Sequence, residues 1–217
     1  MGLEKLKREL ARGVEAGPYL VYAKQFTPGR FVEEENTRIL VARGGREAHL
    51  LFLKLFHGRP PHYAPWVELY AINWEPLPGL RYADSALERK LLSLVAGHLP
   101  PGGKIHVEYL GDRETEEQLQ RGYPEPASRL GYLLFTLGFT WLKDWYFPEG
   151  FLEGEFKLQG EKPLTEADRE RQLSRAAAAL RRFLGEKCDD EVCLRARSRA
   201  ERLLEAIAGR LVLDAAV

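Results

Sequence analysis

Residues 104–150 constrain the fold more than any other part of the chain. Apolar and polar side chains alternate over Lys104–Leu110, which predicts a strand. Leucines recur at helical spacing over Ser128–Leu137, and Gly138 stands where a left-handed C-cap is expected. The aromatic stretch Phe139–Phe147 then predicts a second strand. A strand, a helix, a glycine stop and a returning strand indicate a fold that mixes both element types.

The preceding segments predict a sheet that is mostly antiparallel. Arg38–Arg43 and Ala48–Phe56 read as strands joined by Gly44–Gly45, which is a strong hairpin signal. Trp66–Trp74 continues this meander, and Ser85–Leu99 reads as a helix. Because a helix between two strands is typical of a crossover, part of the sheet is expected to be parallel. The predicted fold class is therefore α+β, with a mixed, mostly antiparallel central sheet and crossover helices.

The composition changes at Pro163, which predicts a boundary between residues 1–162 and 163–217. Thr165–Leu184 and Glu191–Ile207 are rich in Ala, Arg and Leu, and each carries an apolar stripe. Such stripes suit a C-terminal helical hairpin that packs on the core or on another subunit, which would allow a homodimer.

Composition also sets the expected partners and location. The formal net charge is zero, so nucleic acid is not an expected partner. No apolar run approaches the roughly 20 residues of a membrane span, and the charged N-terminal segment lacks an apolar signal core. A cytoplasmic protein is therefore expected. Arg exceeds Lys and Met is scarce, which fits a thermophile.

The two cysteines, Cys188 and Cys193, have four residues between them. No third Cys is present to complete a zinc site. A disulfide would require a break in the helix, which Gly185 and Asp189–Asp190 could supply. In a cytosolic protein, reduced thiols are the favoured interpretation, and a disulfide is the alternative.

Glu108 is the first candidate catalytic residue. It lies on the strand face opposite Tyr109, and a buried carboxylate on a central strand can act as a general base. The alternative is a carboxylate at the sheet rim, paired with Lys104 or an arginine. Asp144 and Tyr146 alternate with tryptophan and phenylalanine on the aromatic strand, so they are weaker candidates for a pocket. Ordinary core packing of these aromatic residues is the alternative.

An acidic run, Asp112 to Glu117, offers carboxylates for a metal ion. However, it contains no histidine, and acidic side chains are favoured in the first turn of a helix. We therefore interpret the run as a helix start capped by Asp112, and no metal site is predicted.

Three sequences together resemble the GNAT family of acyl-CoA-dependent N-acyltransferases. WVELYAINWEPLPGLRYADSALERKLL is similar to that family's fourth strand, cofactor loop and following helix. KIHVEYL is similar to its fifth strand, and LGYLLFTLGFTWLKDWYF resembles its helix that ends in Gly-Phe and returns as a strand. The chain also resembles an uncharacterised family of archaeal and thermophile proteins. The GNAT resemblance implies acetyl-CoA or another acyl-CoA as cofactor and a small-molecule or peptide amine as substrate. It would place the pyrophosphate over Leu80, Arg81, Tyr82, Ala83 and Ser85.

The cofactor loop departs from the family pattern. Gly79 and Ala83 stand out of register with the glycines that let the backbone approach the phosphates, and Asp84 adds a carboxylate. The position of the family's frequent general-acid tyrosine is Leu134. A non-catalytic GNAT-like scaffold that acts as a dimerisation or binding module is therefore the alternative. LPPGGKIHVEYL also resembles S-adenosylmethionine-dependent methyltransferases, a third reading that lacks their glycine-rich loop.

Overall fold

The protein folds around one sheet with helices packed on it. The computed structural model describes residues 2–58, 64–72, 82–83, 85–110, 112–145 and 155–214. Its elements are α1 (Gly2–Arg12), β1 (Val14–Ala16), β2 (Tyr19–Ala23), β3 (Thr27–Pro28), β4 (Glu34–Arg43), β5 (Arg46–Phe56), β6 (Trp66–Ile72), α2 (Ala86–His98), β7 (Lys104–Leu110), α3 (Arg113–Gln120), the 3₁₀ turn η1 (Glu125–Ala127), α4 (Arg129–Thr136), β8 (Trp141–Trp145), β9 (Glu155–Glu161), α5 (Glu166–Leu184) and α6 (Glu191–Asp214).

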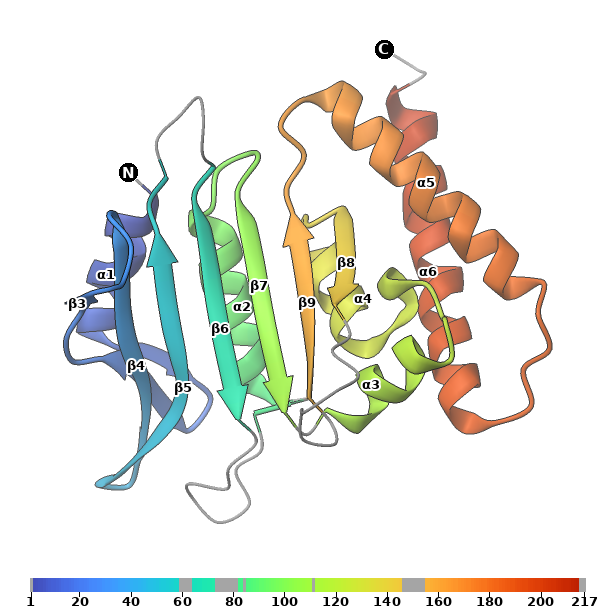
Figure 1. Ribbon diagram of the computed structural model, residues 1–217. Coiled ribbons are helices and arrows are strands. Elements are labelled where there is room, and N and C mark those ends of the chain that lie inside the picture. Colours follow the sequence, from blue (N-terminus) through green and yellow to red (C-terminus); the bar gives the residue numbers. More distant parts are fainter. Residues whose placement is uncertain are drawn as a thin grey trace.

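The described strands form a mixed sheet in the order β1-β2-β4-β5-β6-β7-β9-β8, with β3 beside β4 (Figure 1). β6 and β7 are parallel and are joined through α2, whereas the other described pairs are antiparallel. This arrangement confirms the prediction of an α+β fold with a mixed, mostly antiparallel sheet. In Figure 1, α2 lies behind β6 and β7, and no described helix lies in front of β4–β7.

Local sequence signals explain several of these boundaries. Gly44 and Gly45 have φ values of 55° and 78°, as the tight β4–β5 hairpin requires. The Ser85 hydroxyl accepts a hydrogen bond from the Glu88 amide at the start of α2. Gly138 follows α4 with a φ of 94°, in the left-handed region that glycine occupies without strain. The predicted hairpin, helix start and glycine stop are therefore observed.

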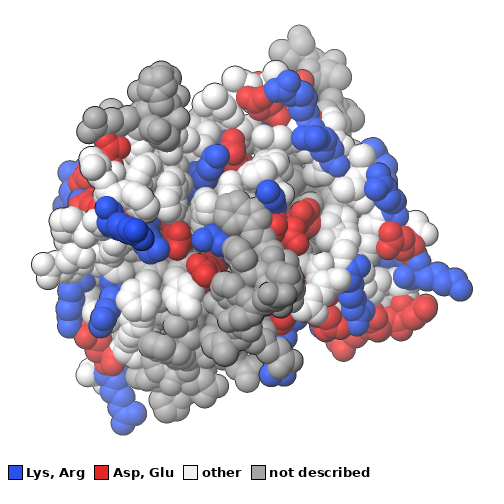
Figure 2. Space-filling model, in the orientation of Figure 1, with Lys and Arg blue, Asp and Glu red and all other residues white. Residues whose placement is uncertain are grey.

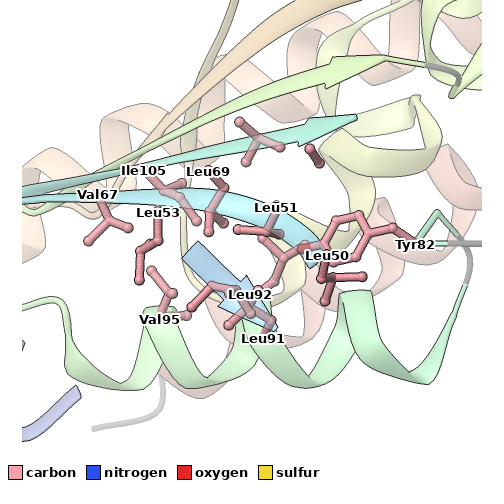
Figure 3. Packing of buried hydrophobic residues seen from close by; sticks show 14 of the residues in the cluster. Leu50, Leu51, Leu53, Val67, Leu69, Tyr82, Leu91, Leu92, Val95 and Ile105 are labelled. Atoms are coloured by element: carbon pink, nitrogen blue, oxygen red, sulfur yellow. The ribbon is translucent and has the colours of Figure 1, made fainter. Parts of the chain in front are cut away.

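The main core lies between the sheet and its helix layer. Figure 3 shows Leu91, Leu92 and Val95 of α2 packed against residues of the sheet such as Leu69 and Ile105. Each of these five side chains is buried. Burial of one such side chain contributes roughly 1.5–3 kcal/mol, so this layer supplies much of the driving force for folding.

A second apolar cluster holds α5 and α6 against each other and against α4. From α5 it includes Leu173 and Leu180, and from α6 Ala200 and Leu203. Phe135 of α4 belongs to the same cluster. The two apolar stripes predicted from the sequence thus meet inside the chain.

Cys188 and Cys193 form a disulfide, so the prediction of reduced thiols is wrong. Cys188 lies in the connection before α6, which begins at Glu191, so the cysteines do not share one continuous helix. The turn brings their Cα atoms to 5.5 Å, which is within the range that a disulfide spans.

Candidate functional site

The start of α2 lies after β6, where the GNAT resemblance would place a cofactor. Of the five predicted cofactor residues, Leu80 and Arg81 lie outside the described residues. Tyr82 is buried, and its ring centroid is 5.6 Å from that of Tyr109. Ser85 already uses its hydroxyl, which donates to the Tyr82 carbonyl and accepts from the Glu88 amide. Ala83 is partly buried and packs against the main core.

A buried ion network occupies the interior next to this helix start. The Arg129 guanidinium donates to both Glu88 carboxylate oxygens, at 2.7 and 2.8 Å, and to Asp112 Oδ2 through Nε at 2.9 Å. Tyr109 Oη donates to Glu88 Oε1 at 2.8 Å. These side chains are almost completely buried. Burial alone would lower the pKa of Arg129, but the hydrogen bonds and charges of Glu88 and Asp112 outweigh it and raise that pKa.

The described residues at the start of α2 do not provide the usual fit for the acyl-CoA pyrophosphate. Glu88 and Asp112 share one guanidinium, so the network carries an excess negative charge that disfavours a phosphate group nearby. β6 and β7 pair residue by residue from Trp66–Lys104 to Ile72–Leu110. Because paired strands lie about 4.8 Å apart, a cofactor cannot pass between them over this length.

The open face of the sheet, opposite α2, holds the predicted base Glu108. Across the strands, Glu108 of β7 lies between Tyr70 of β6 and Lys157 of β9. His106 lies two residues before Glu108 and is the register partner of Glu68. We call Glu68, His106, Glu108 and Lys157 the open-face cluster. Figure 2 shows this side of the molecule, where basic and acidic side chains are intermixed.

Ion pairs join the members of the open-face cluster. Lys157 Nζ lies 3.8 Å from Glu68 Oε2 and 3.7 Å from Glu108 Oε2. Lys54 of β5 donates to Glu68 Oε1 at 3.1 Å. The Glu68 and Glu108 side chains are 11% and 21% exposed, so they are partly shielded from water yet reachable from the surface. The sequence allows two interpretations of Glu108, a general base or a carboxylate paired with Lys104 or an arginine. The observed contact resembles the second, although the partner is Lys157.

His106 brings a neutral imidazole and an aromatic contact into the open-face cluster. Burial, followed by the charge of Lys157, lowers the pKa of His106 to about 4, so the ring is neutral at pH 7. Its ring centroid lies 5.1 Å from that of Trp66, which in turn stacks on Phe56 at 5.4 Å. The arrangement places two carboxylates beside aromatic rings without a charged imidazolium.

Asp144 lies on the other face of the sheet. Its register partner is Leu158, which pairs with Val107, and both of these side chains are buried in the main core. Asp144 instead contacts Glu125 of η1, and burial together with this contact raises the pKa of Glu125. Glu108 and Asp144 therefore cannot act in one site, and Tyr146 lies outside the described residues.

Sequence reasoning missed Glu68 and Lys157 as partners of Glu108. The alternation of WVELYAI and of EFKLQGE does place Glu68 and Lys157 on the polar face of their strands. The missing information was the strand register, which depends on pairing between segments far apart in the chain.

Comparison with known proteins identifies a family. A family model described as "Protein of unknown function (DUF1122)" matches residues 17–187. The chain belongs to this family. Among solved structures, the DUF1122 chain is similar to a protein of unknown function, AQ1966, from Aquifex aeolicus VF5. The two share 37% sequence identity with a TM-score of 0.76, over 93% of this chain and 98% of that one. No curated protein matches.

Proposed function

We propose that this protein is a GNAT-like scaffold that binds an amine, on a small molecule or a peptide, at the open-face cluster. The observation that carries the proposal is the meeting of Glu68 and Glu108 around the Lys157 ammonium. A ligand ammonium, which resembles the Lys157 ammonium in charge and shape, would bind by displacing it from between these carboxylates. The scaffold assignment is supported by the order β6-β7-β9-β8 with α2 crossing between the parallel strands.

The surroundings favour a cation over an anion. An anion near Lys157 would also face the carboxylates of Glu68 and Glu108. An ammonium gains charge-assisted hydrogen bonds from these carboxylates and electrostatic attraction from aromatic faces such as Trp66. Because His106 is neutral at pH 7, it does not repel the ligand.

The test compares two ligands that share a ring and differ in charge. Phenethylamine and phenylacetate are titrated into the full chain, and binding is followed on the His106 ring signals by NMR. We expect phenethylamine to shift these signals and phenylacetate to leave them unchanged. Glu68→Gln and Glu108→Gln should each weaken phenethylamine binding by roughly tenfold or more, as expected for loss of a charged hydrogen-bond partner.

Glu161→Gln is the matched control, because Glu161 lies on the same sheet but pairs with Lys104 outside the open-face cluster. Its affinity for phenethylamine should equal that of the unaltered chain. Equal shifts from the two ligands, or no change at His106 with either, would contradict the proposal.

A second candidate is acyl transfer from acyl-CoA to the bound amine. The connection of the parallel strands β6 and β7 through α2, which the GNAT resemblance implies, is what supports it, whereas the Glu88 and Asp112 carboxylates near the start of α2 oppose a phosphate there. Calorimetry with acetyl-CoA and with CoA tests this candidate separately from amine binding. Absence of binding at millimolar concentration would remove acyl transfer and leave the amine-binding proposal intact.

Methyl transfer from S-adenosylmethionine is the weakest candidate. The described strands contain one parallel pair, whereas the methyltransferase resemblance requires a doubly wound parallel sheet. Lack of thermal stabilisation by S-adenosylmethionine would exclude it.

A further inference from the structure

A cavity of about 630 Å³ lies between the end of α4 and the two C-terminal helices. Its lining residues come from the end of α4, from the connection between β9 and α5, from α5 and from α6, which are elements that the reader can find in Figure 1. Its volume falls in the range of small-molecule pockets, roughly 300–1,000 Å³. It is distinct from the open-face cluster, because none of that cluster's residues lines it.

Apolar side chains make up most of the cavity wall. Phe135, Leu173, Leu203 and Ile207 contribute from three different helices, and each is otherwise buried. Leu164, which is 67% exposed, stands at the rim. A ligand here would remove the exposed Leu164 side chain from water and contact the apolar wall, which favours an apolar body of moderate size.

Two cations, Lys162 and Arg169, also line the cavity. Lys162 Nζ donates to the carbonyl oxygens of Ala96 and Leu99 at the end of α2. Burial lowers the pKa of Lys162, and among the described residues no carboxylate forms an ion pair with it. Arg169 pairs with Glu166, so the lining carries one more positive than negative charge.

We propose that this cavity binds a small apolar carboxylate, with its chain along Leu173, Leu203 and Ile207 and its carboxylate toward Lys162 and Arg169. The apolar walls supply the affinity for the chain, and the excess positive charge selects an anionic head group over a cationic one. A ligand carboxylate would also give the half-buried Lys162 the counter-charge that the described chain does not provide.

The test uses octanoate and octylamine, which share a chain and differ in the charge of the head group. Binding is followed by NMR on the methyl signals of Leu203 and Ile207, so that a ligand at the open-face cluster does not interfere. We expect octanoate to shift both signals and to raise the unfolding temperature. Lys162→Met should weaken octanoate binding by about tenfold, the effect of losing one charged partner.

Lys162→Met could also perturb the end of α2, so a second variant tests the cavity itself. Ala206 lines the cavity and is exposed, so Ala206→Phe fills the space without disturbing the core. It should abolish the octanoate shifts. Ala178→Phe is the control, because Ala178 is exposed on α5 outside the cavity.

Three results would overturn the proposal. Equal shifts of the methyl signals with octanoate and octylamine would show that the cavity binds apolar chains without selecting an anionic head group. No shift from octanoate would show that no carboxylate binds. A dimer detected by light scattering and lost in Ala206→Phe would show that a second copy of the chain fills the cavity.

Discussion

At the scale of single residues, Arg129 shows how a buried charge can hold several elements together. Arg129 is the first residue of α4. Its guanidinium joins Glu88 of α2 to Asp112, the N-cap of α3. Asp112 in turn accepts hydrogen bonds from the Thr115 amide and hydroxyl. Removal of the Arg129 guanidinium would leave the buried Glu88 and Asp112 carboxylates without the positive charge that the described residues place between them.

We expect Arg129→Met to lower the free energy of unfolding by about 3–5 kcal/mol, the usual cost of breaking a buried ion pair from one side. Urea unfolding of the full chain measures this change. Arg202→Met serves as the control, because Arg202 is exposed and its guanidinium donates to the Ser198 hydroxyl rather than to a carboxylate. Similar losses of unfolding free energy in the two variants would show that the buried network stabilises the fold no more than an exposed arginine does.

Glu125 gives the protein a predictable pH dependence. Burial and the neighbouring Asp144 raise its folded pKa above the ordinary value of about 4.5. A group with a raised folded pKa contributes stability that is present below the unfolded pKa and is lost as pH rises through the folded pKa. Glu125→Gln removes this loss, because glutamine does not ionise.

Unfolding temperatures of Glu125→Gln and of the unaltered chain, compared from pH 4 to pH 8, measure the effect. The advantage of the variant should grow as pH increases above about 4.5. Glu166→Gln, at an exposed position on α5, should show no such trend. A constant difference across this pH range would show that folding does not raise the pKa of Glu125.

At the scale of elements, local sequence signals predicted where helices begin and end, whereas contacts between segments far apart in the chain were not predicted. The caps at Ser85 and Asp112 and the glycine stop at Gly138 depend on a few neighbouring residues, so the sequence reveals them. At the start of α2 the Ser85 hydroxyl accepts from the Glu88 amide, whereas the Glu88 carboxylate binds Arg129. Arg129 is 41 residues from Glu88, and no local pattern encodes that pairing.

The Cys188–Cys193 disulfide belongs to the connection between α5 and α6. It lies next to the Asp190 carboxylate, which accepts a hydrogen bond from the Cys193 amide and pairs with Arg121. For a closed loop this short, the chain-entropy model predicts a stabilisation of about 2 kcal/mol. Replacement of both cysteines by alanine should lower the free energy of unfolding by this amount.

Reducing agent provides the internal control for the disulfide. It should lower the stability of the unaltered chain to that of the double variant, and it should not affect the double variant itself. If the unaltered chain and the double variant are equally stable without reductant, the disulfide does not contribute to folding.

At the scale of the whole molecule, the C-terminal helices complete the fold of the chain itself. Their stripe residues bury against Phe135 and Ala127, which belong to the sheet side of the molecule. A homodimer formed by these same stripes would have to separate α5 and α6 from that surface. None of the described helices is long and apolar enough to cross a membrane.

Leu180→Ala distinguishes packing within the chain from packing between subunits. Leu180 is fully buried in the α5–α6 cluster, so the variant should lose about 2–5 kcal/mol of unfolding free energy. Leu194→Ala, on α6 but 53% exposed, should lose much less. If the cluster forms within one chain, the loss in Leu180→Ala is independent of protein concentration. If a partner subunit completed the cluster, mass action would make the unfolding midpoint rise with concentration, and this rise would contradict the cis packing.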